Sequence, residues 1–565
     1  MGKIKFVISL FTLILMVVLL FNGCTKKDTD MQTKFKEFVA KYESKVIPLY
    51  KEVSLAYWNA AISGKKEDFD KVADLQNKMT AIYASKEDYN ALKKIKESGD
   101  IKDDILKREL VVLYNYYLGN QVDTVKLNAV NKMQNDIEQK YGNFRAEAGG
   151  KKLTDNEVEK ILSESKDSKE LMDVWVAHKK IGTLVADDLK KLVKARNEIA
   201  KELGFKNFHD MSLKLSEEDP EEISKLFDEL DNLTKDAFAK EKSNMDDYFV
   251  TRYNVKKEDL KPWHYQNRFF QEAPKIYKVD FDEFYKGKDL AKITETFYKG
   301  INIPIDDLLK NSDLYEKPGK NQHAFCSDID KFGDVRVLCN IIPNEKWMNT
   351  MLHEFGHSDY SKNIDRNLPF TLRDAAQTFT TESIAMMFGR FSTNAQWLKE
   401  NLGIKDEEAK KISDDGFKSL RLQQLVFSRW AQVMYRFEKS MYDNPDQDLN
   451  KLWWDLVEKY QMLKKPEGRN EPDWASKIHI ATVPCYYHNY LLGELLASQL
   501  YSYIVKNVIK SDDFKNQSFT NKPEVGNYLK AKVFGPGMKY FWNDMIEKAT
   551  GEKLTAKYYA KQFVE

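Results

Sequence analysis

Two histidines, His353 and His357, stand four residues apart in the sequence HEFGH, with Glu354 directly after the first. Residues four apart lie on one face of a helix, so both imidazoles can bind a single metal ion. Glu354 can then reach a water molecule on that metal. The chain has 8 His, and a chance match to H-E-x-x-H is expected only about 0.01 times in its length. The motif therefore predicts a metal site.

A catalytic metal site needs a third protein ligand and leaves one position for water. The segment 380–388, TTESIAMMF, is nearly apolar and contains a single carboxylate, Glu382. A carboxylate is costly to bury in such a segment unless it is paired or bound to metal. Its distance from His357 is typical of gluzincin metallopeptidases, so we expect Glu382 to complete the site of one Zn²⁺ ion. The alternative is an ion pair with Arg373 or Arg390.

Two further segments carry groups that could act on a substrate. Residues 477–490, KIHIATVPCYYHNY, contain phenol and imidazole groups, which can stabilise the charge that forms on a carbonyl oxygen under attack. The alternative for these tyrosines is an aromatic stripe in a core. His323 precedes an apolar segment that indicates a strand, and such a histidine is structural unless the strand lines a cleft.

The spacing of apolar residues predicts that helices position these groups. Around Gly333 and Asp334 the pattern instead indicates a short β-hairpin. We find no repeat and no domain linker. The expected fold is mostly α, a large single body with a deep cleft and a small β-hairpin beside the HExxH helix. The helical stretches are 31–149, 175–203, 220–248 and 347–565, the last with a break near Pro445.

The overall composition is that of a globular protein, with 42% hydrophobic residues. Lys and Arg number 89 and Asp and Glu 88, which gives a net charge of +1. Such a balance provides no electrostatic reason to expect nucleic acid as a partner.

The N-terminus differs from the rest of the chain. Two lysines precede the apolar run 6–21, and Asn22-Gly23-Cys24 follows, a pattern typical of a secretory signal. Cys24 after Gly23 is similar to the lipobox of bacterial lipoproteins, although Phe21 occupies the place of the usual leucine. The alternative is a plain N-terminal membrane anchor. We expect a signal peptide at 1–23, lipidation of Cys24, a tether at 24–30 and a helical zinc metallopeptidase domain at 31–565.

These features predict a protein that is exported and anchored by lipid to a bacterial membrane, facing the periplasm or the cell exterior. In such a compartment Cys326 and Cys339, which bracket a short segment, could form a disulfide. The alternative is two unpaired thiols. Cys485 is left over, and we expect it to pack as a small hydrophobic residue.

The chain resembles the angiotensin-converting-enzyme family of peptidyl-dipeptidases, and more distantly the oligoendopeptidase F and thimet oligopeptidase families. The match covers most of the chain after the first hundred or so residues. Its motifs are HEFGH with Leu372-Arg373-Asp374 before Glu382; His323-Ala324, Gly333-Asp334-Val335-Arg336 and Cys339; and Lys477-Ile478-His479-Ile480, Val483-Pro484 and Tyr487-His488-Asn489-Tyr490.

The resemblance implies a role for each of these residues. Glu354 would be the general base and acid, and Tyr490 and His479 would stabilise the oxyanion. His323 would hydrogen-bond the substrate backbone beyond the scissile bond. The implied zinc ligands are His353, His357 and Glu382. The residues implied to hold the C-terminal carboxylate of the substrate, and so to set dipeptide release, are Lys477, Tyr487 and Gln266.

The sequence departs from the family pattern at four points. The segment from His479 to Tyr490 is one residue longer, which leaves open which tyrosine plays which part. Asn489 replaces the chloride-binding arginine. Met386 replaces an aspartate four residues after the ligand glutamate, so the groups that orient the metal ligands must differ. The match of Gln266 requires a shift of one residue.

We therefore expect a monomeric, zinc-dependent peptidase that releases dipeptides from the C-terminus of flexible oligopeptides, with the N-terminal helices roofing a channel. One alternative is an oligoendopeptidase of the oligoendopeptidase F or thimet type, which cuts internally. A second is a metallocarboxypeptidase that releases single residues. A third, from another class, is a catalytically silent peptide-binding lipoprotein, and the presence of Glu354 argues against it.

Overall fold

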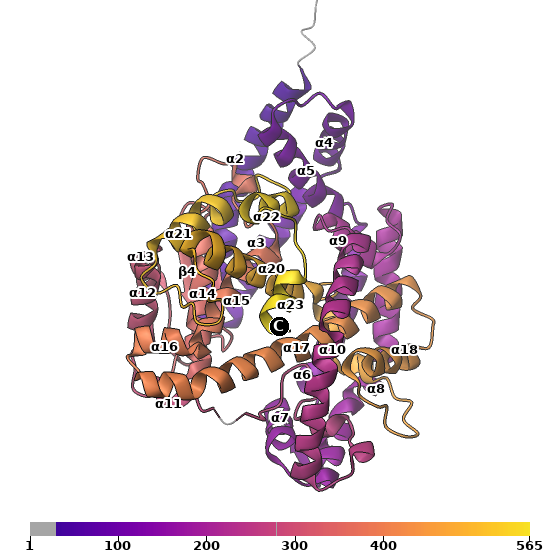
Figure 1. Ribbon diagram of the computed structural model, residues 1–565. Coiled ribbons are helices and arrows are strands. Elements are labelled where there is room, and N and C mark those ends of the chain that lie inside the picture. Colours follow the sequence, from indigo (N-terminus) through magenta and orange to yellow (C-terminus); the bar gives the residue numbers. More distant parts are fainter. Residues whose placement is uncertain (1–29, 278, 565) are drawn as a thin grey trace, which may run out of the picture.

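Helices make up most of the computed structural model, which describes residues 30–277 and 279–564 (Figure 1). The predicted mostly α fold is confirmed. The signal peptide predicted at 1–23, the lipidation site Cys24 and nearly all of the tether at 24–30 lie outside the described residues. None of the helices in the described ranges combines the length and the apolar character that crossing a bilayer requires.

The N-terminal helices project from one end of the molecule (Figure 1). They bury a separate aromatic cluster, in which Phe35 and Tyr117 pack with Phe370 from the central part of the chain. Tyr50 on the first of these helices donates a hydrogen bond to the carbonyl of Asp328, which joins the projection to a β-hairpin. The projecting helices are α2 (Met31–Ser63), α4 (Lys86–Ser98) and α5 (Asp104–Gly119). Helix α3 (Lys66–Tyr83) packs beside α2, and α6 (Thr124–Asn143) packs against α8 (Ser168–Glu202) in the body of the molecule.

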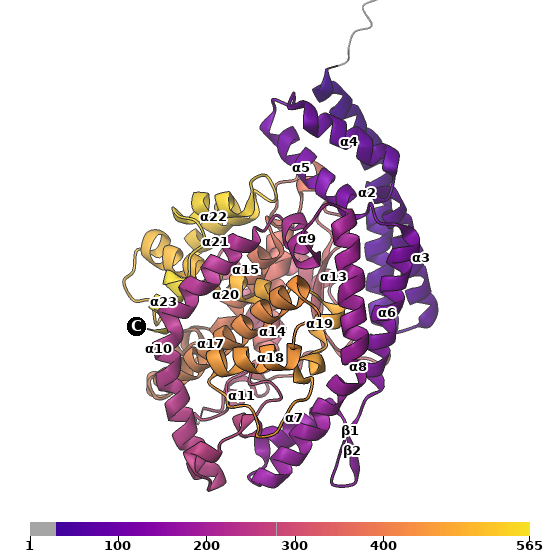
Figure 2. The ribbon, with the colours of Figure 1, turned by 90° about the vertical axis from the view of Figure 1, so that its right-hand side faces the viewer.

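Two long helices frame the rest of the fold, and both begin at an aspartate cap. Asp167 accepts hydrogen bonds from the first turn of α8 (Ser168–Glu202), and Asp219 does the same for α10 (Pro220–Tyr253). Gly204 follows α8 with φ +88°, the left-handed conformation common after a helix end. Figure 2 shows α8 and α10 on either side of the central helices. Between α6 and α10 lie β1 (Ala146–Ala148), β2 (Lys151–Leu153), α7 (Asp155–Glu164) and α9 (Phe208–Leu215).

The β-hairpin predicted around Gly333 and Asp334 is confirmed. Strands β3 (Phe325–Asp328) and β4 (Val335–Leu338) are antiparallel, and β3 packs against α14 (Glu345–Lys362). Sequence reasoning missed a second hairpin, β1–β2, whose two-residue turn consists of Gly149 and Gly150. Its strands are too short to show a clear alternation. The elements before β3 are η1 (Lys257–Asp259), η2 (Pro262–Tyr265), α11 (Asp282–Tyr285), α12 (Leu290–Gly300) and α13 (Asp306–Asn311).

The predicted disulfide between Cys326 and Cys339 is wrong, because both are free thiols. The register of the hairpin explains this, since Val337 lies directly opposite Cys326 and Cys339 is two residues further along the strand. Diagonal neighbours have Cα atoms about 7–8 Å apart, beyond the usual disulfide range of about 4.4–6.8 Å. Cys485 is buried, as expected for a small hydrophobic residue.

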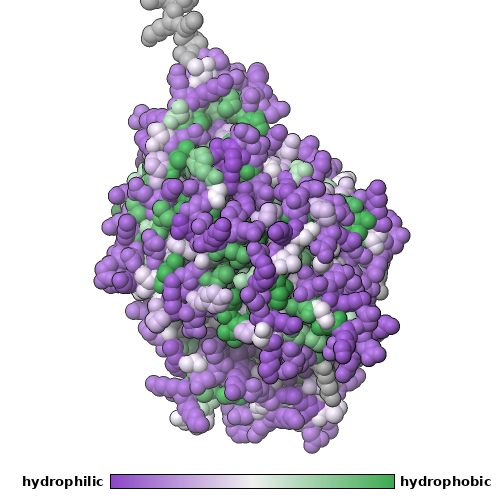
Figure 3. Space-filling model, turned by 90° about the vertical axis from the view of Figure 1, so that its left-hand side faces the viewer, coloured by the Kyte–Doolittle hydropathy of each residue, from purple (hydrophilic) through white to green (hydrophobic). Residues whose placement is uncertain are grey.

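The C-terminal half supplies the centre of the molecule. The largest hydrophobic cluster of the described residues includes residues from Val112 to Phe563 and so draws on both halves of the chain. Helices α14, α15 (Thr378–Gly389) and α20 (His488–Tyr503) pack one against the next within it. The side of the molecule shown in Figure 3 is mainly hydrophilic, with apolar side chains scattered among the polar ones. The remaining elements are η3 (Phe370–Leu372), η4 (Arg390–Thr393), α16 (Ala395–Leu402), α17 (Asp406–Asp443), α18 (Leu449–Leu456), η5 (Val457–Gln461), η6 (Asp473–Ser476), α19 (His479–Thr482), η7 (Ile504–Ile509), α21 (Pro523–Leu529), η8 (Lys530–Phe534), α22 (Trp542–Thr550) and α23 (Lys557–Phe563).

Candidate metal centre and active site

Helix α14 begins at Asn344, whose side chain accepts a hydrogen bond of 2.9 Å from the backbone N–H of Trp347. The helix then buries an apolar face, formed by Met348, Met351, Leu352 and Phe355. Gly356 lets α15 approach closely, because a Cβ atom at this position would lie 3.0 Å from Cα of Ala385. This close packing brings the HEFGH residues against the helix that carries Glu382.

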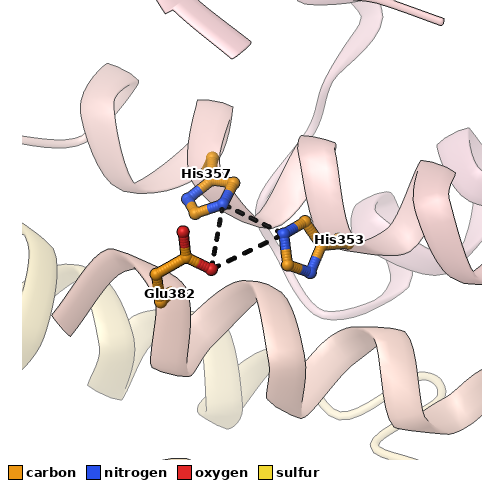
Figure 4. A group of neighbouring side chains, drawn as sticks. All are labelled: His353, His357 and Glu382. Atoms are coloured by element: carbon orange, nitrogen blue, oxygen red, sulfur yellow. Dashed lines mark hydrogen bonds and ion pairs between the residues drawn. The ribbon is translucent and has the colours of Figure 1, made fainter. Parts of the chain in front are cut away.

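The two histidines and Glu382 point toward one another from α14 and α15 (Figure 4). The Nε2 atoms of His353 and His357 are 3.2 Å apart, and Oε2 of Glu382 is 3.7 and 3.8 Å from them. Ligands about 2.05 Å from a tetrahedral zinc ion are about 3.3 Å from one another, so the group fits such an ion. Among the described residues, this is the one His, Cys and carboxylate group with metal-binding spacing.

The alternative predicted for Glu382, an ion pair with an arginine, is not formed. Arg373 donates from Nε to the carbonyl of Leu368 at 2.8 Å. Arg390 forms its ion pair with Glu494 on α20. Glu382 therefore has no arginine partner in the described part of the chain, and its position beside two imidazoles favours the ligand role.

The electrostatic environment also suits a cation. Burial lowers the pKa of His353 to about 4 and holds the pKa of His357 well below its ordinary value, so both rings are neutral at pH 7, as metal ligands must be. Burial and the charge of Glu494 raise the pKa of Glu382 to about 7. Burial and the charge of Glu382 raise the pKa of Glu354 to about 8. A divalent cation here would favour the charged carboxylates.

Thr381 supplies an orienting contact that sequence reasoning missed. Its Oγ1 lies 2.7 Å from Nδ1 of His357. When Nε2 of His357 binds a metal, Nδ1 carries the proton and can donate it to this hydroxyl, which fixes the ring. The signal was present, since Thr381 is a polar residue directly before Glu382. Met386, which replaces the family aspartate, instead packs against Gly493 of α20.

Tyr486, Tyr487 and Tyr490 form an aromatic row beside the metal ligands. The ring centroids of Tyr486 and Tyr487 each lie 5.3 Å from that of Tyr490. Burial and the charge of Glu382 raise the pKa values of Tyr490 and Tyr486, so both phenols stay protonated and can donate a hydrogen bond. The ring of His479 is 5.3 Å from that of Tyr487, and burial lowers the pKa of His479 to about 4.

Lys477 and Tyr487 lie together as predicted, but the glutamine beside them is Gln271 and not Gln266. Nζ of Lys477 donates to Oε1 of Gln271 at 2.6 Å and lies 5.4 Å from the ring centroid of Tyr487. The hydroxyl of Tyr487 accepts a hydrogen bond of 2.7 Å from Trp430. The sequence resemblance implies that Lys477 and Tyr487 hold a substrate carboxylate, so we call Lys477, Gln271 and Tyr487 the carboxylate clamp.

The prediction that Gln266 belongs to this group is wrong. Its amide is used within the local loop, where Oε1 accepts from the N–H of Lys275 at 3.0 Å and Nε2 donates to the carbonyl of Ser163 at 3.2 Å. The loop backbone is left-handed at Gln266, with φ +59°, and the chain thus presents Gln271 to Lys477 instead. Two glutamines five residues apart cannot be distinguished by sequence spacing alone.

His323 lies just before β3 and not within the hairpin. Its side chain is exposed, and its backbone N–H donates to Asn321 at 2.9 Å. A cavity of about 750 Å³ is lined by His353 together with Met386, Tyr277 and Glu494. One of the three residues of the metal group therefore borders a space that could hold several residues of an extended peptide.

Comparison with known proteins gives a consistent result across the chain. The family model described as angiotensin-converting enzyme matches residues 29–563. The mouse (Mus musculus) angiotensin-converting enzyme is 22% identical over 562 residues, which cover 93% of this chain and 42% of that protein. The enzyme of Theromyzon tessulatum is 23% identical over 310 residues, which cover 52% and 50%. The chain thus spans about two fifths of the length of the mouse and rat relatives.

Proposed function

The chain belongs to the angiotensin-converting enzyme family of metallopeptidases, and we propose that it hydrolyses oligopeptides near the C-terminus and releases dipeptides. The observation that carries this proposal is the continuity between the carboxylate clamp and the metal group. Lys477 lies against the ring of Tyr487, which packs on Tyr490, and the charge of Glu382 acts on Tyr490. A peptide whose C-terminal carboxylate is held at the clamp would place a nearby peptide bond at the metal.

Different residues would bind the metal, transfer the proton and stabilise the oxyanion. His353, His357 and Glu382 would hold Zn²⁺, which acts when bound as a Lewis acid and activates water. Glu354 takes the proton of the attacking water and later delivers it to the leaving amine. The phenol of Tyr490 and the ring of His479 donate to the developing oxyanion. His323 would contact the substrate backbone.

A peptide series with free and amidated C-termini tests the cleavage mode, with products identified by mass spectrometry. We expect dipeptides from the free acids and little cleavage of the amides. Equal cleavage of both forms at internal bonds would identify an oligoendopeptidase, and release of single residues a carboxypeptidase. No cleavage of any peptide by the zinc-loaded protein would leave the silent peptide-binding role.

Replacing Lys477 with Met should lower kcat/KM for free-acid peptides by about 20- to 50-fold, because a buried charge-assisted contact to the carboxylate is lost. The value for amidated peptides should change less than threefold. Lys179 is the matched control. It is also a buried lysine beside Phe269, but its Nζ contacts Ser476 and not Gln271. An equal loss on both peptide types would contradict the clamp.

The pH profile gives a second readout of the same variant. Burial, and then the charge of Arg268, lowers the pKa of Lys477 to about 7, while Glu272 and Glu159 act in the opposite direction. Only the protonated ammonium attracts a carboxylate. The kcat/KM for free-acid peptides should therefore fall as pH rises through about 7, and this limb should be absent with amidated peptides and in Lys477→Met.

We further propose that the protein is exported and held by lipid on Cys24, because a basic and then apolar segment ends at Gly23. In a bacterial host, Cys24→Ala should move the protein from the membrane fraction to the soluble fraction or leave an uncleaved precursor without incorporated fatty acid. Cys485→Ala is the control and should label normally. Fatty-acid labelling that survives in Cys24→Ala would contradict the proposal.

A further inference from the structure

A buried carboxylate lies apart from the metal group and contacts two helices, one that carries a metal ligand and one that carries Tyr490. Glu218 stands in the turn between α9 and α10, directly after Glu217, and its side chain is only 1% exposed. A buried carboxylate is costly unless hydrogen bonds satisfy it. The identity of its two partners suggests a role in the active site.

Each oxygen of Glu218 has one partner. Oε2 accepts from Nε2 of His488 at 2.6 Å, and Oε1 accepts from Nε2 of Gln377 at 3.0 Å. His488 is the first residue of α20, and Gln377 is the N-cap residue of α15. The amide of Gln377 also donates to the carbonyl of Ser216 at 2.8 Å, within the same turn. One carboxylate thus joins the N-terminal ends of two helices.

These two helix ends carry the active-site groups. Thr381 and Glu382 lie in the first turns of α15, and Tyr490 lies in the first turn of α20. The helices are already in close contact at Gly493, where a Cβ atom would lie 3.2 Å from Cβ of Glu382. A small change in the separation or rotation of either end would therefore move Tyr490 relative to the metal ligand.

The turn itself is held firmly on both sides. Glu217 forms an ion pair with Arg108 on α5, and its carbonyl accepts a hydrogen bond of 2.8 Å from Trp542 on α22. Arg108 also donates from Nε to the carbonyl of Met538 at 2.8 Å. Glu218 thus projects from a fixed support, so its two bonds can set the position of the helix ends.

We propose that Glu218 is a positioning residue that sets the geometry between the metal ligand Glu382 and Tyr490, through Gln377 on α15 and His488 on α20. This inference rests on the proposed peptidase function. A charge-assisted bond from the imidazole and a bond from the amide converge on one buried anion, so loss of either leaves a buried polar group unpaired. A displacement of about 1 Å in an active-site group can lower a rate by about 10²-fold.

The test uses Glu218→Gln, which keeps the shape of the side chain. His488 and Gln377 both donate to residue 218, but glutamine has only one acceptor oxygen, so one of the two bonds is lost. We expect kcat to fall by about 10- to 50-fold with KM changed less than threefold, and zinc dissociation to be about tenfold more favourable in chelator competition. Glu217→Gln is the matched control, on the adjacent residue. It removes the ion pair with Arg108 but keeps the hydrogen bond from Trp542 to the carbonyl of residue 217, which still holds the turn. The unfolding temperature should therefore fall, while kcat should change less than threefold.

Glu218→Gln combined with Gln377→Glu provides the rescue. The amide introduced at position 218 can donate to the carboxylate introduced at position 377 and accept from His488. Both bonds to residue 218 therefore return, while the bond to the carbonyl of Ser216 is replaced by a contact between two acceptors. We expect kcat within about fivefold of the unmodified protein.

An unchanged kcat in Glu218→Gln, or a double variant no more active than the single one, overturns the positioning role. If Glu218→Gln does not fold, kcat of the double variant is the test, and an inactive double variant overturns the proposal. Failure of the peptidase function is a separate result, because then the unmodified protein would not cleave any peptide of the series.

Discussion

Replacing Glu354 with Gln is expected to lower kcat by about 10³- to 10⁴-fold, with little effect on zinc content or on peptide binding. Glu354 follows the first histidine of the metal group and is buried, with a pKa raised by burial and by the charge of Glu382. Glutamine has the same shape but cannot accept a proton. Single-turnover rates and metal content on the same sample would separate loss of chemistry from loss of the ion.

Glu345→Gln provides a control on the same helix. Glu345 is also a carboxylate whose pKa burial raises, and it lines the cavity that reaches His353, but its hydrogen bond is to Ser392. The change should leave kcat within about threefold. If Glu354→Gln kept more than a tenth of the unmodified rate with full zinc content, Glu354 would not be the general base. An unchanged rate would contradict the enzyme assignment itself.

The parts of the site that depend on local sequence could be predicted before the structure. His353 and His357 occupy one helix, and their spacing of four places both on one face, with Glu354 directly after the first. Asn344 starts that helix, as its residue type and place indicate. Glu382 could be predicted because a lone carboxylate in an apolar helix requires a partner.

The parts that depend on contacts between distant segments could not be predicted. Gln271 rather than Gln266 reaches Lys477 because the backbone between them turns through a left-handed residue, which no spacing rule foresees. Glu218 meets His488 across 270 positions of the chain, and its sequence context is that of an ordinary acidic helix start. The disulfide prediction failed because the register of the hairpin places Val337 opposite Cys326, and this register cannot be read from the spacing of the two cysteines.

Replacing Tyr490 with Phe is expected to lower kcat by about 10²- to 10³-fold with KM nearly unchanged, which is the usual effect of removing one donor to an oxyanion. Phenylalanine keeps the ring that packs 5.3 Å from both Tyr486 and Tyr487, so only the hydroxyl is lost. Burial and the charge of Glu382 raise the pKa of Tyr490, which keeps the phenol protonated and able to donate across the range in which peptides are cleaved.

Tyr486→Phe is the control that decides between neighbouring tyrosines, because the charge of Glu382 acts on Tyr486 as well. Tyr486 precedes the first turn of α20, whereas Tyr490 lies within it, where Glu218 holds the helix end through His488. We expect Tyr486→Phe to lower kcat less than about fivefold. A large loss in Tyr486→Phe with a small one in Tyr490→Phe would exchange their roles, and the extra residue between His479 and Tyr490 would then have moved the oxyanion donor along the chain. Small losses in both would place stabilisation of the oxyanion on His479, whose low pKa keeps its ring neutral.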